Sequence, residues 1–125
     1  MKAAIAPGFS ELIITVNPAG ELPREGLLNL HMPWLFAPWP EVREKGVAEM
    51  DVEGESVRAL LTTVAEAYKK AEVDLAPINP RTNDMDEDYD VFINDKNYIT
   101  LPGRLDTKLE DGDRVKLKIL WRWDG

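Results

Sequence analysis

The densest group of chemically capable side chains in the sequence is a run of carboxylates in its second half, at Asp84, Asp86, Glu87, Asp88 and Asp90. Their alternating spacing imitates a calcium-binding loop, whose twelfth position would fall on Asp95. Such a loop needs a glycine where Tyr89 stands and a long bidentate glutamate at its end. We therefore predict no metal site here, but a solvated acidic connection that could face a basic partner.

Few residues in the rest of the sequence could support nucleophilic or metal chemistry. The chain has no cysteine, which excludes a disulfide framework, a thiolate zinc site and a cysteine nucleophile. The only histidine is His31, so histidine-rich metal sites are excluded and a Ser-His-Asp triad has little support. No phosphate-binding glycine loop is present. We predict no catalytic residues, no metal and no bound cofactor, and hence a protein that is not a free-standing enzyme.

The charge balance is acidic, with 23 Asp and Glu against 15 Lys and Arg and a formal net charge of -8 at pH 7. This balance argues against nucleic-acid binding and favours docking on a cationic partner. A small basic stripe nevertheless follows the predicted last strand, at Lys116, Lys118 and Arg122. The stripe could bind a carboxylate or phosphate of a partner, or it could pair with acidic residues of neighbouring strands, which is the commoner use.

Neither a membrane segment nor an export signal is evident. The longest uncharged stretch, residues 27–40, contains Asn29, His31 and three prolines, and it is too short to cross the roughly 30 Å hydrocarbon core of a bilayer. The N-terminal residues lack the apolar core of a secretory signal. We expect a cytoplasmic protein that makes no contact with a membrane.

The clearest element available to position side chains is a helix over residues 57–70. Its apolar side chains recur at helical spacing, at Val57, Leu60, Leu61, Val64 and Tyr68. Ser56 is a favourable N-cap, and Lys69 and Lys70 lie in the last turn, where the helix dipole favours positive charge. The pattern predicts an amphipathic helix with one buried face.

Alternating apolar residues predict strands before this helix. Residues 47–54 are typical of a half-buried strand that directs Met50 and Val52 inward. Residues 27–37 are typical of another strand, which Pro33 interrupts because proline cannot donate a ladder hydrogen bond. We expect a bulge or an edge position there.

Strands are also predicted after the helix. A long polar connection, residues 72–88, leads to a hairpin formed by residues 90–95 and 96–101, which turns at Asn94 and Asp95. A tight Asp-Gly turn then precedes the last strand. The inward positions of that strand are expected at Val115, Leu117 and Ile119.

The order of these elements predicts an α+β protein with a mixed sheet of four to five strands, packed on one main helix. This is the order of the ubiquitin-like β-grasp fold. Residues 1–26 are predicted to stand outside it as an N-terminal extension, in which residues 11–16 could form one extra strand and residues 17–26 read as a turn-rich linker. The predicted β-grasp domain spans residues 27–125.

Several short segments of that domain follow one another in the order of a known pattern. They are Phe36-Ala37, residues 42–46, residues 55–61 and residues 92–95. The most specific segment is 107–115, which reads Thr-Lys-Leu-Glu-Asp-Gly-Asp-Arg-Val and contains Asp111, Gly112 and Asp113. In this order the segments resemble the small sulfur carrier proteins of the MoaD/ThiS family. The resemblance covers roughly residues 27–125.

This resemblance implies a carrier whose C-terminal carboxylate, that of Gly125, is adenylated by an E1-like enzyme of the MoeB or ThiF type and converted to a thiocarboxylate. The partner enzyme would use the ATP. The sulfur would then be transferred in cofactor synthesis or tRNA thiolation, through an acceptor such as the large subunit of molybdopterin synthase. The same match implies that Phe36 belongs to the core, which leaves Trp39 as the better exposed aromatic residue of a proline-rich loop. Both are candidates for a partner surface.

The sequence ends in Leu120-Trp121-Arg122-Trp123-Asp124-Gly125, so Gly125 alone matches the Gly-Gly end of such carriers. Glycine is favoured there because the tail must thread a narrow channel. We predict that Trp121, Arg122, Trp123 and Asp124 contact the partner. Alternatively, the protein is a β-grasp binding module or adaptor without carrier chemistry, in which a tail tryptophan anchors an interface or packs against the core.

Overall fold

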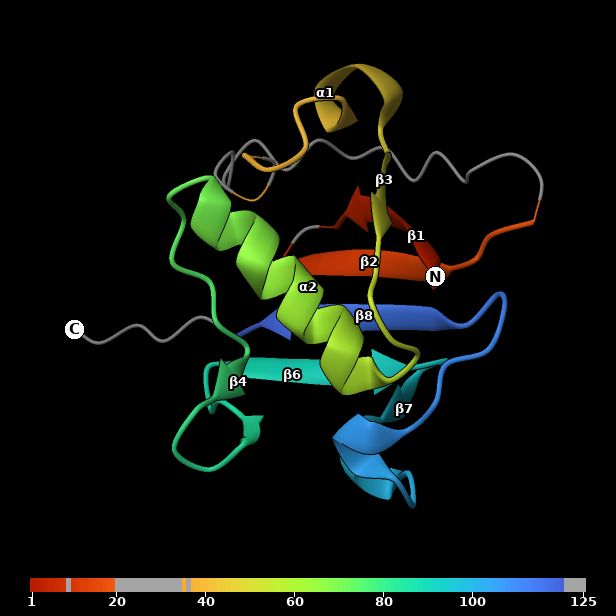
Figure 1. The fold of residues 1–125 in the computed structure, drawn as a ribbon, viewed down its shortest axis with the longest axis vertical. Coiled ribbons are helices and arrows are strands. Elements are labelled where there is room, and N and C mark those ends of the chain that lie inside the picture. Colours follow the sequence, from red (N-terminus) through yellow and green to blue (C-terminus); the bar gives the residue numbers. More distant parts are fainter. Residues whose placement is uncertain (9, 20–34, 36, 121–125) are drawn as a thin grey trace.

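The computed structural model describes residues 1–8, 10–19, 35 and 37–120 (Figure 1). Its main sheet has six strands in the order β3-β1-β2-β8-β6-β7. Their bounds are β1 Lys2–Pro7, β2 Glu11–Val16, β3 Ala48–Asp51, β6 Tyr89–Ile93, β7 Lys96–Asn97 and β8 Arg114–Ile119. Every ladder between neighbouring strands in the described chain is antiparallel.

One main helix lies across this sheet (Figure 1). The described helices are α1 Val42–Lys45 and α2 Val57–Lys70, with the short 3-10 helices η2 Tyr98–Thr100 and η3 Arg104–Asp106. A separate small hairpin joins β4 Ile78–Asn79 to β5 Asp84–Met85. Within the described ranges, no helix combines the length and apolar character needed to cross a membrane. The predicted α+β class with one main helix is confirmed, and the arrangement is compatible with a β-grasp.

The sheet differs from the prediction because residues 1–26 contribute two strands to its middle. Strand β1 pairs with β2 and β3, and β2 pairs with β8. The sheet therefore has six strands rather than four to five, and its described ladders are antiparallel rather than mixed. The prediction that residues 11–16 could form an extra strand is confirmed, but β1 was not predicted, and both strands lie inside the sheet rather than in an extension outside it. Deleting residues 1–26 would remove two inner strands.

Strand β1 could not be predicted from the sequence because three of its six residues are alanine, which is depleted in strands. Ala3 and Ile5 belong to the core on the α2 side, while Ala4 and Ala6 are buried on the opposite side. Burial on both faces suits an inner strand, in which small side chains allow close packing. Val16 ends the neighbouring strand β2 in the same core.

The main helix begins and ends where the periodicity predicts, and its five predicted apolar positions are all buried. Ser56 accepts a hydrogen bond from the backbone N–H of Ala59 at 3.1 Å, as an N-cap does. The buried stripe of α2 packs on the inward residues of the central strands. These include Leu12, Ile14, Val115 and Leu117. One core between α2 and the sheet therefore holds the first two strands and β8 together.

The strand before the helix and the hairpin after it are confirmed, but with shorter strands than predicted. Strand β3 is shorter than predicted, with Val52 buried and Met50 half-buried against the core. The hairpin turn is confirmed, since Asn94 and Asp95 have φ of 50° and 68°, as a tight hairpin turn requires. Its second strand ends early because the side chain of Asn97 accepts a bond from the Ile99 N–H and starts η2.

Two other predictions concern segments before and after α2. The predicted polar connection 72–88 contains the β4–β5 hairpin. The predicted strand 27–37 lies outside the described residues, apart from Leu35 and Ala37. Leu35 is fully buried, and its carbonyl oxygen accepts a hydrogen bond of 2.7 Å from the hydroxyl of Tyr68.

Candidate functional site

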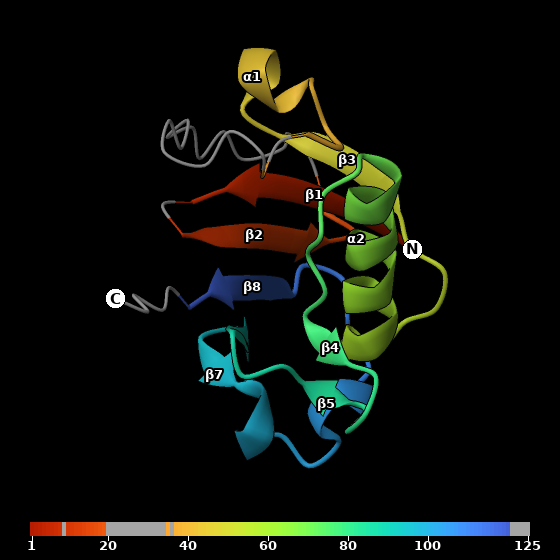
Figure 2. The ribbon, with the colours of Figure 1, turned by 90° about the vertical axis from the view of Figure 1, so that its left-hand side faces the viewer.

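The face of the main sheet that points away from α2 carries Lys116 and Lys118 of the predicted basic stripe, whose third member, Arg122, lies outside the described residues. Because side chains alternate along a strand, the residues between the core positions of β2, β6 and β8 point to this side. They are Glu11, Ile13, Thr15, Asp90, Phe92, Arg114, Lys116 and Lys118, and all are exposed or half-buried. We call this set the outer face. Figure 2 views the sheet from the side, with α2 against the opposite face.

The strand register sets the outer face out in rows. Ile13 lies opposite Lys116, which lies opposite Phe92 on the next strand. The adjacent row places Lys118 between Glu11 and Asp90. One row therefore places a lysine between two apolar side chains, and the next places a lysine between two acidic ones. The register thus sets Lys118 opposite two acids, the arrangement that the predicted cross-strand pairing requires.

The two lysines of β8 also make weaker contacts. The Nζ atom of Lys118 lies 5.9 Å from the ring centroid of Phe92, within reach of a cation–π interaction. The Nζ atom of Lys116 lies 3.9 Å from a carboxylate oxygen of Asp95, whose side chain is 90% exposed. Exposed pairs of this kind contribute little to stability. Both lysines can therefore exchange these contacts for a carboxylate or phosphate of a partner at small cost.

The predicted motif Asp111-Gly112-Asp113 forms the turn that starts β8. Gly112 has φ of 84°, a left-handed conformation that favours glycine, and its N–H donates to the Val16 carbonyl at 2.7 Å. The Asp113 carboxylate accepts the Glu110 N–H at 2.8 Å. The motif thus fixes the turn against the end of β2.

The same turn also links the two neighbouring loops. Asn94 donates from Nδ2 to Asp113 at 2.9 Å and accepts the Arg114 N–H at 3.0 Å on its side-chain oxygen. Asn17 donates to the carboxylate of Asp111 at 2.8 Å. These bonds join the β6–β7 turn and the end of β2 to the start of β8. The motif residues therefore position the strand that carries the basic stripe.

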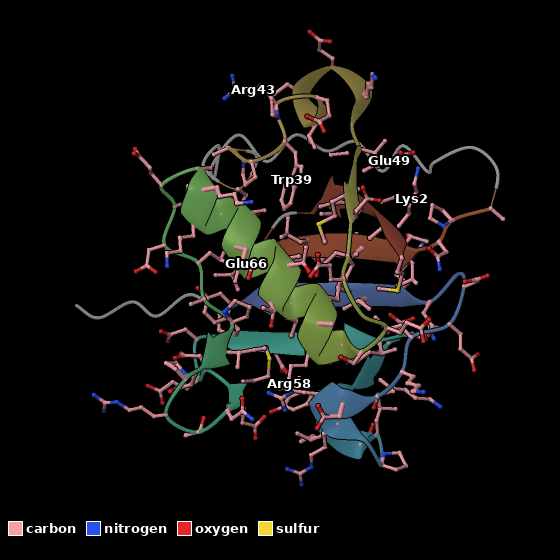
Figure 3. All side chains as sticks on the ribbon, viewed as in Figure 1. Lys2, Trp39, Arg43, Glu49, Arg58 and Glu66 are labelled. Carbon is pink, nitrogen blue, oxygen red and sulfur yellow. The ribbon has the colours of Figure 1, made fainter. Side chains whose placement is uncertain are left out.

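The prediction that Trp39 is an exposed docking residue is wrong. Trp39 is 6% exposed, and its ring packs edge-on against Tyr68 with centroids 5.3 Å apart. Figure 3 shows it between α1 and α2, directed at the helix. The loop around Trp39 therefore closes the core. Phe36, the other candidate of this loop, lies outside the described residues.

The predicted tail residues Trp121, Arg122, Trp123, Asp124 and Gly125 also lie outside the described residues. The chain that leads to them is fixed up to Leu120. Ile119 donates its N–H to Ser10, and Leu120 donates its N–H to the Asp88 carbonyl at 2.8 Å. The outer face and the sequence that ends in Gly125 therefore share strand β8.

Carboxylates of the acidic run accept hydrogen bonds from a tyrosine hydroxyl and from backbone N–H groups. Asp84 accepts the hydroxyl of Tyr98 at 3.1 Å, Asp86 accepts the Asp88 N–H, and Asp90 accepts the Val91 N–H. In the described part of the chain, no three acidic or histidine side chains form a group that could hold a metal ion. The carboxylates thus order the start of β6.

Sequence reasoning missed one feature, a groove of about 560 Å³ on the helix side of the molecule. It lies between α2, from Leu61 onward, and the segment 72–78 that follows it. A signal for it was present, since Val73, Leu75 and Ile78 are apolar residues in a stretch that reads as a polar connection. We call it the helix-side groove.

Comparison of the chain with protein-family models, with curated proteins and with solved structures finds no match.

Proposed function

We propose that this protein is a sulfur carrier of the MoaD/ThiS type that works in the cytoplasm. The carboxylate of Gly125 attacks the α-phosphate of ATP on an E1-like adenylating enzyme and releases pyrophosphate. A sulfur nucleophile at the oxidation level of sulfide then displaces AMP and leaves a thiocarboxylate. An acceptor enzyme, such as the large subunit of a molybdopterin synthase, receives the sulfur.

The observation that carries this proposal is the continuity of β8. A carrier needs a surface that its partners recognise and a terminus delivered at a fixed distance from that surface. Strand β8 presents Lys116 and Lys118 on the outer face, and the chain continues from its end toward Gly125. Because β8 is paired on both sides, docking through the lysines would hold the start of the tail in one position.

A second candidate is supported by Asp124, which stands where carriers of this type have glycine. A carboxylate beside the reacting carboxylate would be repelled by the phosphates of ATP. In this alternative the outer face still docks on a partner, but the tail undergoes no chemistry. The protein would then be a binding module or adaptor subunit.

The intact mass of the protein purified from its native host decides between the two. We expect the exchange of one carboxylate oxygen for sulfur, located in the C-terminal peptide by fragmentation. A protein that stays unmodified after incubation with ATP, a sulfide donor and the E1-like enzyme of the same host would overturn the carrier proposal and leave the adaptor.

Replacing Asp124 with glycine provides a matched test of the tail. If Asp124 weakens a working carrier, the Asp124→Gly variant should release pyrophosphate faster than the unchanged protein with the same enzyme. Equal rates would show that the aspartate does not limit adenylation.

A further inference from the structure

The helix-side groove has an apolar floor contributed by two elements. Leu61 and Ala65 face it from α2, and Val73, Leu75 and Ile78 face it from the following segment. Leu61 and Leu75 are buried, whereas the other three are half-buried. The short side chain of Ala65 leaves room between the two walls. Side chains of moderate size, such as leucine, can therefore enter the groove and bury apolar surface.

The rim of the groove is acidic. Glu66, Glu72 and Asp74 are exposed along it, against a single lysine, Lys69. Glu66 projects from α2 in Figure 3. The rim therefore carries a net negative charge beside an apolar floor, which is the complement of an apolar segment flanked by basic residues.

Both walls of the groove are fixed by backbone hydrogen bonds. At the end of α2 the Glu72 N–H donates to Lys69 and the Val73 N–H donates to Tyr68, the two bonds of a Schellman motif. The opposite wall continues into β4, and the Pro77 carbonyl accepts the Asp86 N–H at 2.8 Å. A preformed groove loses little conformational entropy when it binds a ligand.

Glu72 occupies a position where glycine is the usual residue. Its φ is 61°, and helices commonly place glycine at this left-handed position after their last turn. A glutamate there is conformationally unfavourable, yet its carboxylate adds to the acidic rim. Glu72 therefore lowers the stability of the helix end but adds a negative charge beside the groove.

We propose that the helix-side groove binds a short segment of a partner protein in which apolar anchor residues are flanked by lysine or arginine. The acidic rim disfavours phosphate-rich ligands, and its charge matches a basic peptide. The groove and the outer face lie on opposite sides of the main sheet. A partner in the groove would therefore leave the outer face open to a second protein, which extends the proposed function without depending on it.

The test is a titration of the isotope-labelled full chain with a short synthetic peptide of lysines and leucines, followed by amide chemical shifts. We expect the largest shifts at Ala65, Glu66 and Val73, and none there with a matched peptide of glutamates and leucines. Shifts spread evenly over the acidic surface, or centred on the outer face, would overturn the proposal.

Two charge variants on α2 should change the affinity for the peptide in opposite directions. Glu66→Lys should weaken binding of the lysine–leucine peptide about fivefold, and Lys69→Glu should strengthen it by a similar factor. Glu49→Lys makes the same change in net charge on β3 and serves as the control (Figure 3). Equal effects of Glu66→Lys and Glu49→Lys would show that attraction to the whole protein, and not the groove, binds the peptide.

The chain's own tail is the competing occupant. A variant with both Trp121→Ala and Trp123→Ala, examined without peptide, should leave the shifts of the groove amides unchanged. Large shifts at those amides would show that the tail fills the groove and would overturn the partner assignment. Because the readout is peptide binding, failure here is separable from failure to form a thiocarboxylate.

Discussion

The two sides of the main sheet differ in charge and in construction. The outer face is built by strand register, which sets Lys116 and Lys118 in regular rows beside Phe92. The helix-side groove is built by the end of one helix and the irregular segment after it, with an acidic rim. A face of mixed charge with two exchangeable lysines on one side, and an acidic groove on the other, suit two different partners. A sheet face is fixed by the whole fold, whereas the groove depends on local backbone geometry.

The largest effect should come from a residue on which both surfaces depend. Leu117 is fully buried in the middle of β8, under α2. We expect Leu117→Ala to lower the free energy of unfolding by about 2–5 kcal/mol, measured by urea denaturation. Leu120→Ala, at a position that is 43% exposed, is the control and should change it by less than about 0.5 kcal/mol. Similar losses in both variants would contradict a core centred on β8.

A charge reversal should separate the two surfaces. The double variant Lys116→Glu with Lys118→Glu is expected to slow adenylation by the E1-like enzyme about tenfold, because association is steered by complementary charge. Binding of the lysine–leucine peptide should weaken by less than about twofold, since the groove lies on the other side of the sheet. Loss of both activities together would show that the two surfaces are not independent.

The pH dependence of stability should report the burial of Tyr68 on the helix side of the sheet. Burial, and then the charge of Tyr89, raises the pKa of Tyr68 well above its ordinary value of 10.0. The neutral hydroxyl is favoured in the folded state, so this stabilisation is complete below about pH 10 and is lost as the pH rises above that value. We expect Tyr68→Phe to reduce the alkaline slope by up to about 1.4 kcal/mol per pH unit.

Near neutral pH the same variant loses the hydrogen bond to Leu35, at a cost of about 1 kcal/mol. Denaturation curves across the alkaline range measure both effects. If the slopes of Tyr68→Phe and the unchanged protein coincide, the hydroxyl is not held neutral by burial.

The smallest effect concerns the end of α2. Replacing Glu72 with glycine should stabilise the protein by about 0.5–1 kcal/mol, because glycine adopts the left-handed conformation without strain. The same variant should bind the lysine–leucine peptide about twofold to threefold more weakly, since one rim charge is lost. A variant that neither gains stability nor loses affinity for the peptide would contradict the argument that Glu72 contributes its charge to the groove at a cost in stability. The thermal midpoint and the peptide titration measure the two quantities.

Local signals predicted the second half of the fold well. The stripe that includes Leu60 and Val64 has helical period, Ser56 caps the helix, and the turn at residues 94–95 follows from local backbone preference. Each of these features is decided by residues close in sequence. The same holds for Asp111-Gly112-Asp113, although its partners Asn17 and Asn94 could not be read from spacing.

The first half was harder because its contacts are long-range. Strand β1 lacks the β-branched pattern of a strand, and its position depends on pairing with Val16 and Met50 across the sheet. Trp39 was predicted to be exposed because the resemblance assigned Phe36 to the core, but its ring packs edge-on against Tyr68 of α2, a contact that sequence spacing cannot reveal. The groove was missed for the same reason, since segment 72–78 becomes a wall only once it returns along α2.

The pairing of β2 with β8 has a consequence for how the protein folds. Glu11 lies opposite Lys118, so the central ladder joins residues from nearly opposite ends of the sequence. Because β2 is synthesised long before β8, the sheet cannot close until residues 114–119 have been made. Contacts of such high sequence separation slow folding. Until then β2 lacks its partner on that side, and an unpaired strand edge of this kind favours aggregation of the incomplete chain.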